Sequence, residues 1–92
     1  MEIQHFEDGH KGKFFVKEHG NELAAMTYEW AGKDRFIIDH TEVSEQLAGQ
    51  GVGKKLVMKA VEMARYKQVK IDPLCPFANK VLRNKDEYLD IL

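Results

Sequence analysis

Three segments in the first half of the chain, 14–17, 23–30 and 35–43, are strand-like, and apolar and polar residues alternate most clearly within 23–30. Successive side chains of a strand point to opposite faces, so a period of two predicts half-buried β-strands. Polar turns at 19–22 and 32–34 separate the segments. The sequence therefore predicts three strands that pair antiparallel with their neighbours. Residues 1–12 are polar and are predicted to form either a frayed end or a short first strand.

The alternation also assigns faces. In segment 23–30 it places Ala24, Met26, Tyr28 and Trp30 together on one face. In segment 35–43 it predicts one face with Ile37, Asp39, Thr41 and Val43, and another with Phe36, Ile38, His40 and Glu42.

The second half of the chain changes to a helical period. Apolar residues recur at helical spacing and predict a helix from residue 52 to about residue 66; they are Val52, Leu56, Val57, Ala60, Val61 and Ala64. Residues 69–71 begin a strand, which a right-handed crossover would make parallel to the preceding one, and Pro73 is expected to end it. Pro76 opens a second helix to about residue 84, with Phe77, Val81 and Leu82 facing inward. The apolar residues of the tail 86–92 are expected to dock on the core.

A glycine-rich run, 47–55, lies between the third strand and the first helix. It contains Gly49, Gly51 and Gly53 and ends in Lys54 and Lys55. Glycines allow close approach of backbone N–H groups, and the free N–H groups of a first helical turn attract anions, so the run predicts a phosphate or pyrophosphate site. A Walker loop does not fit, because its spacing and its Ser or Thr after the lysine are missing, and a dinucleotide fingerprint would need a glycine at Lys54.

Composition limits the classes of function. The chain has 92 residues, 43% of them apolar, and 14 basic residues against 15 acidic ones, for a net charge of −1. This balance gives no argument for nucleic acid or membrane partners. One cysteine forms no internal disulfide, which agrees with a reducing compartment, and with no signal peptide a cytoplasmic location is expected. His5, His10 and His19 show no metal-ligand spacing, so no metal is expected.

The glycine run resembles the loop of the GNAT acetyltransferase superfamily, Arg/Gln-x-x-Gly-x-Gly/Ala. Gly51 and Gly53 match this pattern, whereas Ala48 stands where the superfamily usually has Arg or Gln. Three further runs resemble a family of small GNAT-like N-acetyltransferases of this length: Ile38-Asp39-His40-Thr41-x-Val43, Leu74-Cys75-Pro76-Phe77 and the C-terminal Glu87-Tyr88. The resemblance covers about residues 14 to 90. It departs at Lys85-Asp86, where the family often has His-Pro.

The resemblance implies a mixed α/β (α+β) fold: a minimal GNAT fold in a single domain, 1–92, with three antiparallel strands followed by loop, helix, strand and helix. It also implies acetyl-coenzyme A as cosubstrate and an amine as acceptor. The cofactor would contact Thr41, Val43, Gly49, Gln50, Gly51, Val52, Gly53, Lys54, Lys55 and Asn79. Lys54 and Lys55 are equally well interpreted as solvated surface lysines, and Asn79 as an ordinary polar residue of a helix; for Lys59 the solvated interpretation is favoured.

Two residues are candidates for catalysis. His40 lies just before the loop, where an imidazole would accept a proton from an amine or from Cys75. Cys75 precedes Pro76 at the start of a helix, whose dipole favours a nucleophilic thiolate. The competing interpretations are a strand histidine satisfied by a neighbour and a buried, inert thiol. In the resembling family this cysteine and this histidine are proposed as active-site residues. Tyr88 is a weaker candidate for an acid, with core packing the favoured role.

Two chemical routes stay open: direct attack of the amine on the thioester, or a ping-pong route through an acetylated Cys75. A different class of function is also open: a coenzyme A or acyl-coenzyme A binding protein with little or no transferase activity. It is considered because the chain lacks the N-terminal helices that shape acceptor pockets in larger relatives. A nucleotide-binding interaction module is a third and weaker hypothesis. The expected partners are acetyl-coenzyme A and an unidentified amine, and the expected state is a monomer or weak homodimer.

Overall fold

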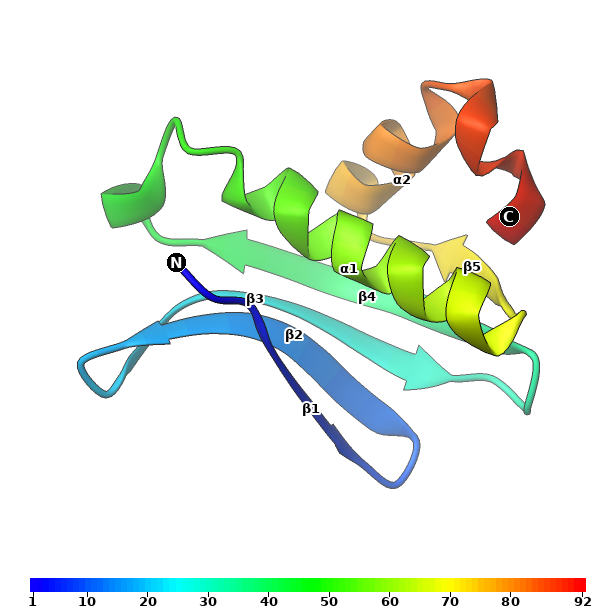
Figure 1. Ribbon diagram of the computed structural model, residues 1–92, viewed down its shortest axis with the longest axis horizontal. Coiled ribbons are helices and arrows are strands. Elements are labelled where there is room, and N and C mark those ends of the chain that lie inside the picture. Colours follow the sequence, from blue (N-terminus) through cyan, green and yellow to red (C-terminus); the bar gives the residue numbers. More distant parts are fainter.

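The computed structural model describes residues 1–92 and contains one five-stranded sheet (Figure 1). The strands are hydrogen-bonded in chain order, with antiparallel neighbours from β1 to β4 and a parallel pair, β4 and β5. The predicted mixed fold, its antiparallel strands and its parallel last strand are thereby confirmed. The strands are β1 (Gln4–Asp8), β2 (Lys11–Glu18), β3 (Asn21–Trp30), β4 (Arg35–Val43) and β5 (Lys70–Pro73). Of the two predictions for the N-terminus, the short strand is the one observed.

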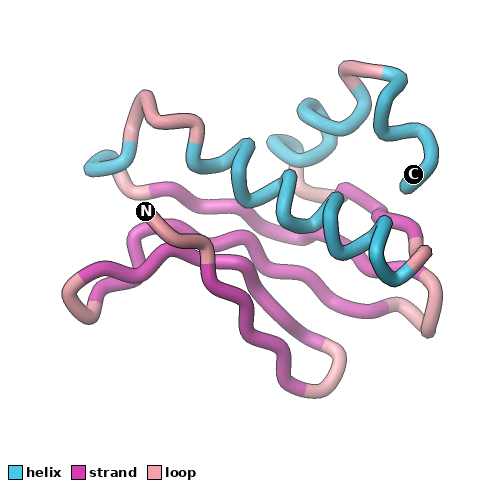
Figure 2. The backbone as a smooth tube through the Cα atoms, in the orientation of Figure 1, coloured by secondary structure: helices cyan, strands magenta, loops and turns pink.

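Two α-helices lie beside this sheet (Figure 2). Helix α1 (Val52–Lys67) forms the crossover from β4 to β5 and packs across β2, β3, β4 and β5. Helix α2 (Pro76–Arg83) follows β5 and contacts α1, β4 and β5. Short 3-10 helices precede α1 (η1, Glu45–Leu47) and end the chain (η2, Asp86–Ile91). None of these helices has the length and apolar character needed to span a bilayer.

The helices cover only one face of the sheet. The strand residues on that face are buried with the apolar stripe of α1 and with Ala78 and Leu82 of α2 in one cluster of 22 residues. The strand residues concerned are Phe14, Val16, Ala24, Met26, Tyr28, Phe36, Ile38 and Ile71. The opposite face, which carries Phe15, Ala25, Thr27 and Ile37, has no layer packed on it and stays partly exposed. We call this side the open face.

One prediction about the core is wrong. Phe77 was expected to face inward, but its side chain is 41% exposed, and α2 instead buries Ala78 and Leu82. These two residues are four apart and share one helical stripe, whereas Phe77 lies one step around the helix. The tail does dock as predicted, because Tyr88 and Ile91 of η2 are buried in the cluster.

Hydrogen bonds fix β1 to the rest of the sheet at one polar cluster. The Tyr28 hydroxyl donates to Glu7 Oε1 at 2.6 Å, and Trp30 Nε1 donates to the same oxygen at 2.8 Å. His5 Nε2 lies 2.5 Å from the Tyr28 hydroxyl oxygen. Because the tyrosine proton goes to Glu7, His5 must donate, which assigns the proton to its Nε2. The His5 ring also stacks on Phe14, with centroids 4.3 Å apart.

This cluster predicts that acid weakens the fold. Burial lowers the pKa of His5, and hydrogen bonds from Tyr28 and then Trp30 lower the pKa of Glu7. The unfolded chain therefore binds protons first at both groups, so the free energy of unfolding falls as pH drops below about 6.5 and again below about 4.5. We expect urea unfolding at pH 7, 5.5 and 4 to show progressively lower midpoints. The Glu7→Gln variant should reduce the lower step without removing it, since the pKa of Asp90 is also lowered by its bond to Arg65; an unchanged lower step would contradict the role of Glu7.

Candidate active site

A β-bulge in β4 sets the direction of the residues that precede the loop. Tyr28 pairs with Ile38, but the next residue of β3, Thr27, pairs with His40, so Asp39 is the extra residue. The Thr27 hydroxyl donates to Asp39 Oδ1 at 2.5 Å and fastens the bulge on the open face. An extra residue shifts the alternation by one position beyond the bulge.

The predicted faces of β4 are therefore correct up to Asp39 and wrong from His40 onward. Thr41 pairs with Met26 and Val43 with Ala24, which places both on the helix-covered face. His40 pairs with Thr27 and lies on the open face. A strict period of two cannot anticipate this change, because the bulge depends on a partner in another strand.

Strands β4 and β5 separate immediately after this point. Their pairing ends at Ile38 with Pro73, and the N–H groups of Leu74 and Cys75 both donate to the Ile38 carbonyl, each at 3.0 Å. The chain then turns into α2 while β4 continues to Val43. Residues 39–43 of β4 consequently have no β5 neighbour along this edge, which leaves strand edge available to an extended ligand.

A cleft of about 500 Å³ begins at this edge and ends at the start of α1. We call it the loop cleft. It brings together seven of the predicted cofactor residues: Thr41, Val43, Gly49, Gly51, Val52, Gly53 and Lys54. Its other lining residues, Leu47, Ala48 and Phe77, were not predicted as site residues. The predicted Gln50, Lys55 and Asn79 are not among its lining residues. A sequence signal for Phe77 did exist, namely its place in the helix start that follows Cys75.

The loop itself is built to expose backbone N–H groups. Gly49 and Gly51 have φ angles of 79° and 68°, a left-handed conformation that other residues adopt at a cost of about 1 kcal/mol. Gly51 is the N-cap of α1, no side chain caps this end, and no acidic residue lies in its first turn. The first N–H groups of α1 are thus left for a ligand, with the positive end of the helix dipole behind them.

Gly53 is required for a different reason. A Cβ atom at this position would lie 2.8 Å from Cζ of the Phe77 ring. The absence of a side chain lets the ring lie directly on the first turn of α1, so that Phe77 becomes a wall of the loop cleft. This contact ties the start of α2 to the start of α1.

Cys75 is the N-cap of α2, as predicted, and is 5% exposed. Its Sγ–H group donates to Thr41 Oγ1 at 3.2 Å, across the point where β4 and β5 separate. Thr41 lines the loop cleft and Cys75 lies behind it. The side chain of Thr41 thus separates the thiol from the loop cleft.

His40 lies on the other side of the same strand. Its side chain is 67% exposed, and its Nε2 atom is 3.4 Å from Glu42 Oε2. The structure therefore does not bring His40 into contact with Cys75, because the bulge directs the two to opposite faces of the sheet. His40 is accessible to a molecule that approaches the open face.

Asn79 and Tyr88 make contacts within the protein. Asn79 Nδ2 donates to the Pro73 carbonyl at 3.1 Å, which fastens α2 to the end of β5. The hydroxyl of the buried Tyr88 donates to Met58 Sδ at 3.5 Å, and burial raises its pKa. The packing role favoured for Tyr88 agrees with this placement.

Comparison with known proteins gives consistent matches. The model of the GCN5-related N-acetyl-transferase family matches residues 13–91. Protein NATD1 of Xenopus tropicalis is 26% identical over 95 residues, covering 100% of this chain and 85% of that protein. The solution structure of a GCN5-like protein from Staphylococcus aureus is 41% identical, with a TM-score of 0.74 over 98% of this chain and 85% of that one.

A more distant structure shares the fold. It is a GNAT family acetyltransferase from Elizabethkingia anophelis with acetyl-CoA bound, 18% identical, with a TM-score of 0.55 over 66% of this chain and 40% of that one. The family model covers almost the whole length described above, including the bulged strand, the glycine loop and α2. The chain belongs to the GCN5-related N-acetyltransferase family.

Proposed function

We propose that this chain, as a single domain spanning 1–92, transfers the acetyl group of acetyl-coenzyme A to an amine. The observation that carries the proposal is the loop cleft, which joins an unpaired strand edge to an uncapped helix start. An elongated molecule with amides at one end and phosphates at the other matches that order of groups.

The residues present fit coenzyme A. The N–H groups of Val52, Gly53 and Lys54 would hold the pyrophosphate, with the Lys54 ammonium beside them. Ala48 offers no side-chain donor, so the backbone carries most of this contact. The exposed edge at Thr41 and Val43 would pair with the pantetheine amides. Three further contacts stay predictions: Gln50, Lys55 and Asn79. The cofactor would reach these residues only if it extended beyond the loop cleft.

Acetyl-coenzyme A supplies a thioester, whose carbonyl carbon is the electrophile. The protein's part is to present the amine and to take its proton. His40 is on the open face, next to the point where β4 and β5 separate, and we assign it as the base for an amine that reaches the thioester from that face through the gap between the two strands. A carbon–nitrogen bond forms, the carbon–sulfur bond breaks, and protonation of the leaving thiolate balances the proton that His40 accepts.

The burial of Cys75 supports direct attack over the ping-pong route. A thiol that is 5% exposed and hydrogen-bonded to Thr41 is poorly placed to meet an incoming amine after it has been acetylated. Direct attack needs Cys75 only as a packing group at the start of α2. Acetylation of the thiol alone would not establish the ping-pong route, because a nearby thioester also modifies bystander thiols.

An amide-resolved NMR titration with acetyl-coenzyme A, coenzyme A and ATP tests the proposal. We expect shifts at residues 41–43 and 49–54 with both coenzyme A ligands and none with ATP. Turnover with a panel of amines then separates a transferase from a protein that only binds acyl-coenzyme A. No response at millimolar ligand would contradict the assigned cofactor, and binding without turnover would contradict the transfer.

A further inference from the structure

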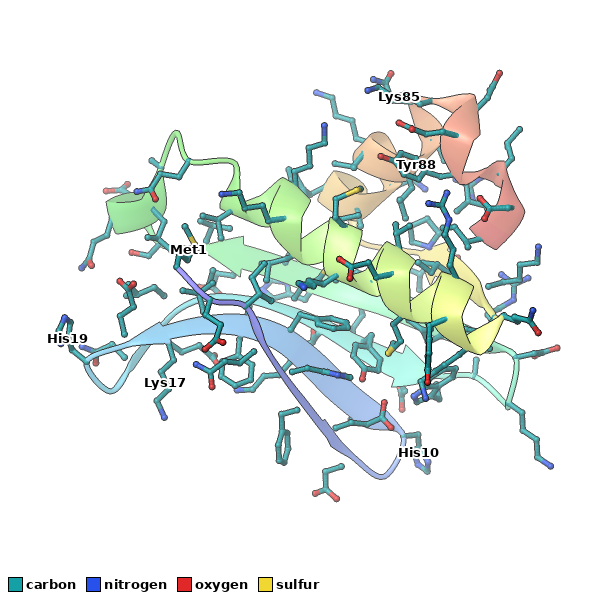
Figure 3. The ribbon with its side chains drawn as sticks, viewed as in Figure 1. Met1, His10, Lys17, His19, Lys85 and Tyr88 are labelled. Atoms are coloured by element: carbon teal, nitrogen blue, oxygen red, sulfur yellow. The ribbon has the colours of Figure 1, made fainter.

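A second cleft continues from the loop cleft and is rich in lysine. It lies between α1 and α2, has a volume of about 290 Å³, and shares Lys54 and Phe77 with the loop cleft. Its other lining residues include Lys80, Asn84 and Lys85. We call it the lysine cleft. Figure 3 shows Lys85 after α2, at the outer end of this region, with Tyr88 close by.

The charge of the lysine cleft is unbalanced. Three of its lining residues are lysines and none is acidic. Neither Lys54 nor Lys80 forms an ion pair, and Lys85 makes only a loose one with Glu87, at 3.8 Å between side chains that are each 58% exposed. Like charges that converge without a carboxylate favour a bound anion.

The lysine cleft also offers an aromatic surface. Phe77 packs one part of its ring against Gly53 and remains 41% exposed where the two clefts meet. A ring in that position can stack with a planar base. The Asn84 side chain adds hydrogen-bond donors and an acceptor at the C-terminal end of α2.

A groove on the other side of Lys54 is a poorer match. Its lining includes Lys55, Met58, Lys59 and Glu62, and it contains no aromatic ring. The carboxylate of Glu62 lies 3.7 Å from the Lys59 ammonium, so it already neutralises part of the positive charge of this groove. An anionic nucleotide is repelled there by Glu62 and has no ring to stack on.

We propose that the lysine cleft binds the adenosine 3′-phosphate end of coenzyme A, with Lys80 and Lys85 on the 3′-phosphate and Phe77 against the adenine. The inference rests on the proposed function, since it continues the same ligand past the pyrophosphate site at Lys54. Lys80 and Lys85 then select coenzyme A over nucleotides and analogues that lack the 3′-phosphate.

Calorimetric titration with coenzyme A and with 3′-dephospho-coenzyme A tests this, because the two ligands differ only in the 3′-phosphate. We expect coenzyme A to bind about tenfold more tightly at low salt, with the difference shrinking as salt screens the charges. Lys80→Gln and Lys85→Gln should each lower coenzyme A affinity about threefold, and the double variant should bind the two ligands equally. Lys59→Gln, in the opposite groove, is the matched control and should keep the tenfold preference.

Equal binding of the two ligands by the unaltered protein would overturn the inference and leave the proposed function standing. A preference that survives in the Lys80→Gln/Lys85→Gln variant, or that disappears in Lys59→Gln, would overturn it as well. Absence of binding by either ligand would overturn the proposed function and this inference together.

Discussion

Replacing His40 by alanine is expected to lower kcat for acetyl transfer about a hundredfold, the lower range of what a positioned general base contributes. The affinity for acetyl-coenzyme A should be unchanged, because the bulge places His40 on the open face, away from the loop cleft. The measurement is steady-state kinetics with an amine found in the panel, together with a titration of the cofactor. A large change in kcat without a change in binding is the signature of a group that acts only in the transition state.

Cys75→Ala is the companion variant. It should retain most of the kcat of the unaltered enzyme if the amine attacks the thioester directly, and lose nearly all of it if Cys75 carries the acetyl group. Full activity of His40→Ala would assign the base to another group. Cofactor binding in both variants shows whether the loop cleft is still formed.

Replacing Gly12 by alanine is expected to destabilise the fold by about 2 kcal/mol, the cost of overpacking a filled site. Gly12 pairs with Tyr28 across β2 and β3, and the tyrosine ring lies directly over it, where an added Cβ would overlap the ring. Tyr28 cannot move aside cheaply, since it is 1% exposed and its hydroxyl is bonded to Glu7 and His5. Thermal unfolding should show a midpoint lower by roughly 10 °C.

A double-mutant cycle separates the clash from other effects of the alanine. In a Tyr28→Leu background the ring is gone, so the same glycine replacement should cost much less. Equal losses in the two backgrounds would show that the ring is not the cause. Activity is not needed for this measurement, because the site lies on other strands.

The local patterns of the sequence predicted most of the fold. The strand-like segments 14–17, 23–30 and 35–43 fall within β2, β3 and β4, and helical spacing placed α1 to within one residue of its observed end. Glycine chemistry predicted the unusual backbone of the loop, because Gly49 and Gly51 adopt the left-handed conformation that only glycine accepts easily. These features depend on residues that are close together in the chain.

What the sequence did not predict depends on partners that are distant in the chain. The bulge at Asp39 is held by Thr27 of another strand, and it reversed the faces of His40 and Thr41. Phe77 lines the cleft because Gly53, in another helix, leaves room for its ring. The pairing of residues 4–8 with β2 is stabilised by the hydrogen bonds of His5 and Glu7 with Tyr28. These bonds cannot be predicted from either segment alone.

The crossover through α1 also has a consequence for the order of folding. Strands β1 to β4 are joined by short turns, so the pairs between them are close in sequence. The pairing of Arg35 in β4 with Lys70 in β5 has to close a much longer segment of chain, which costs more entropy. The loop cleft is lined by residues from both ends of this crossover. Thr41 and Val43 of β4 come before it, and Phe77 comes after β5. A ligand that binds only the completed cleft therefore stabilises the native state and not a partly folded form in which β5 is still unpaired.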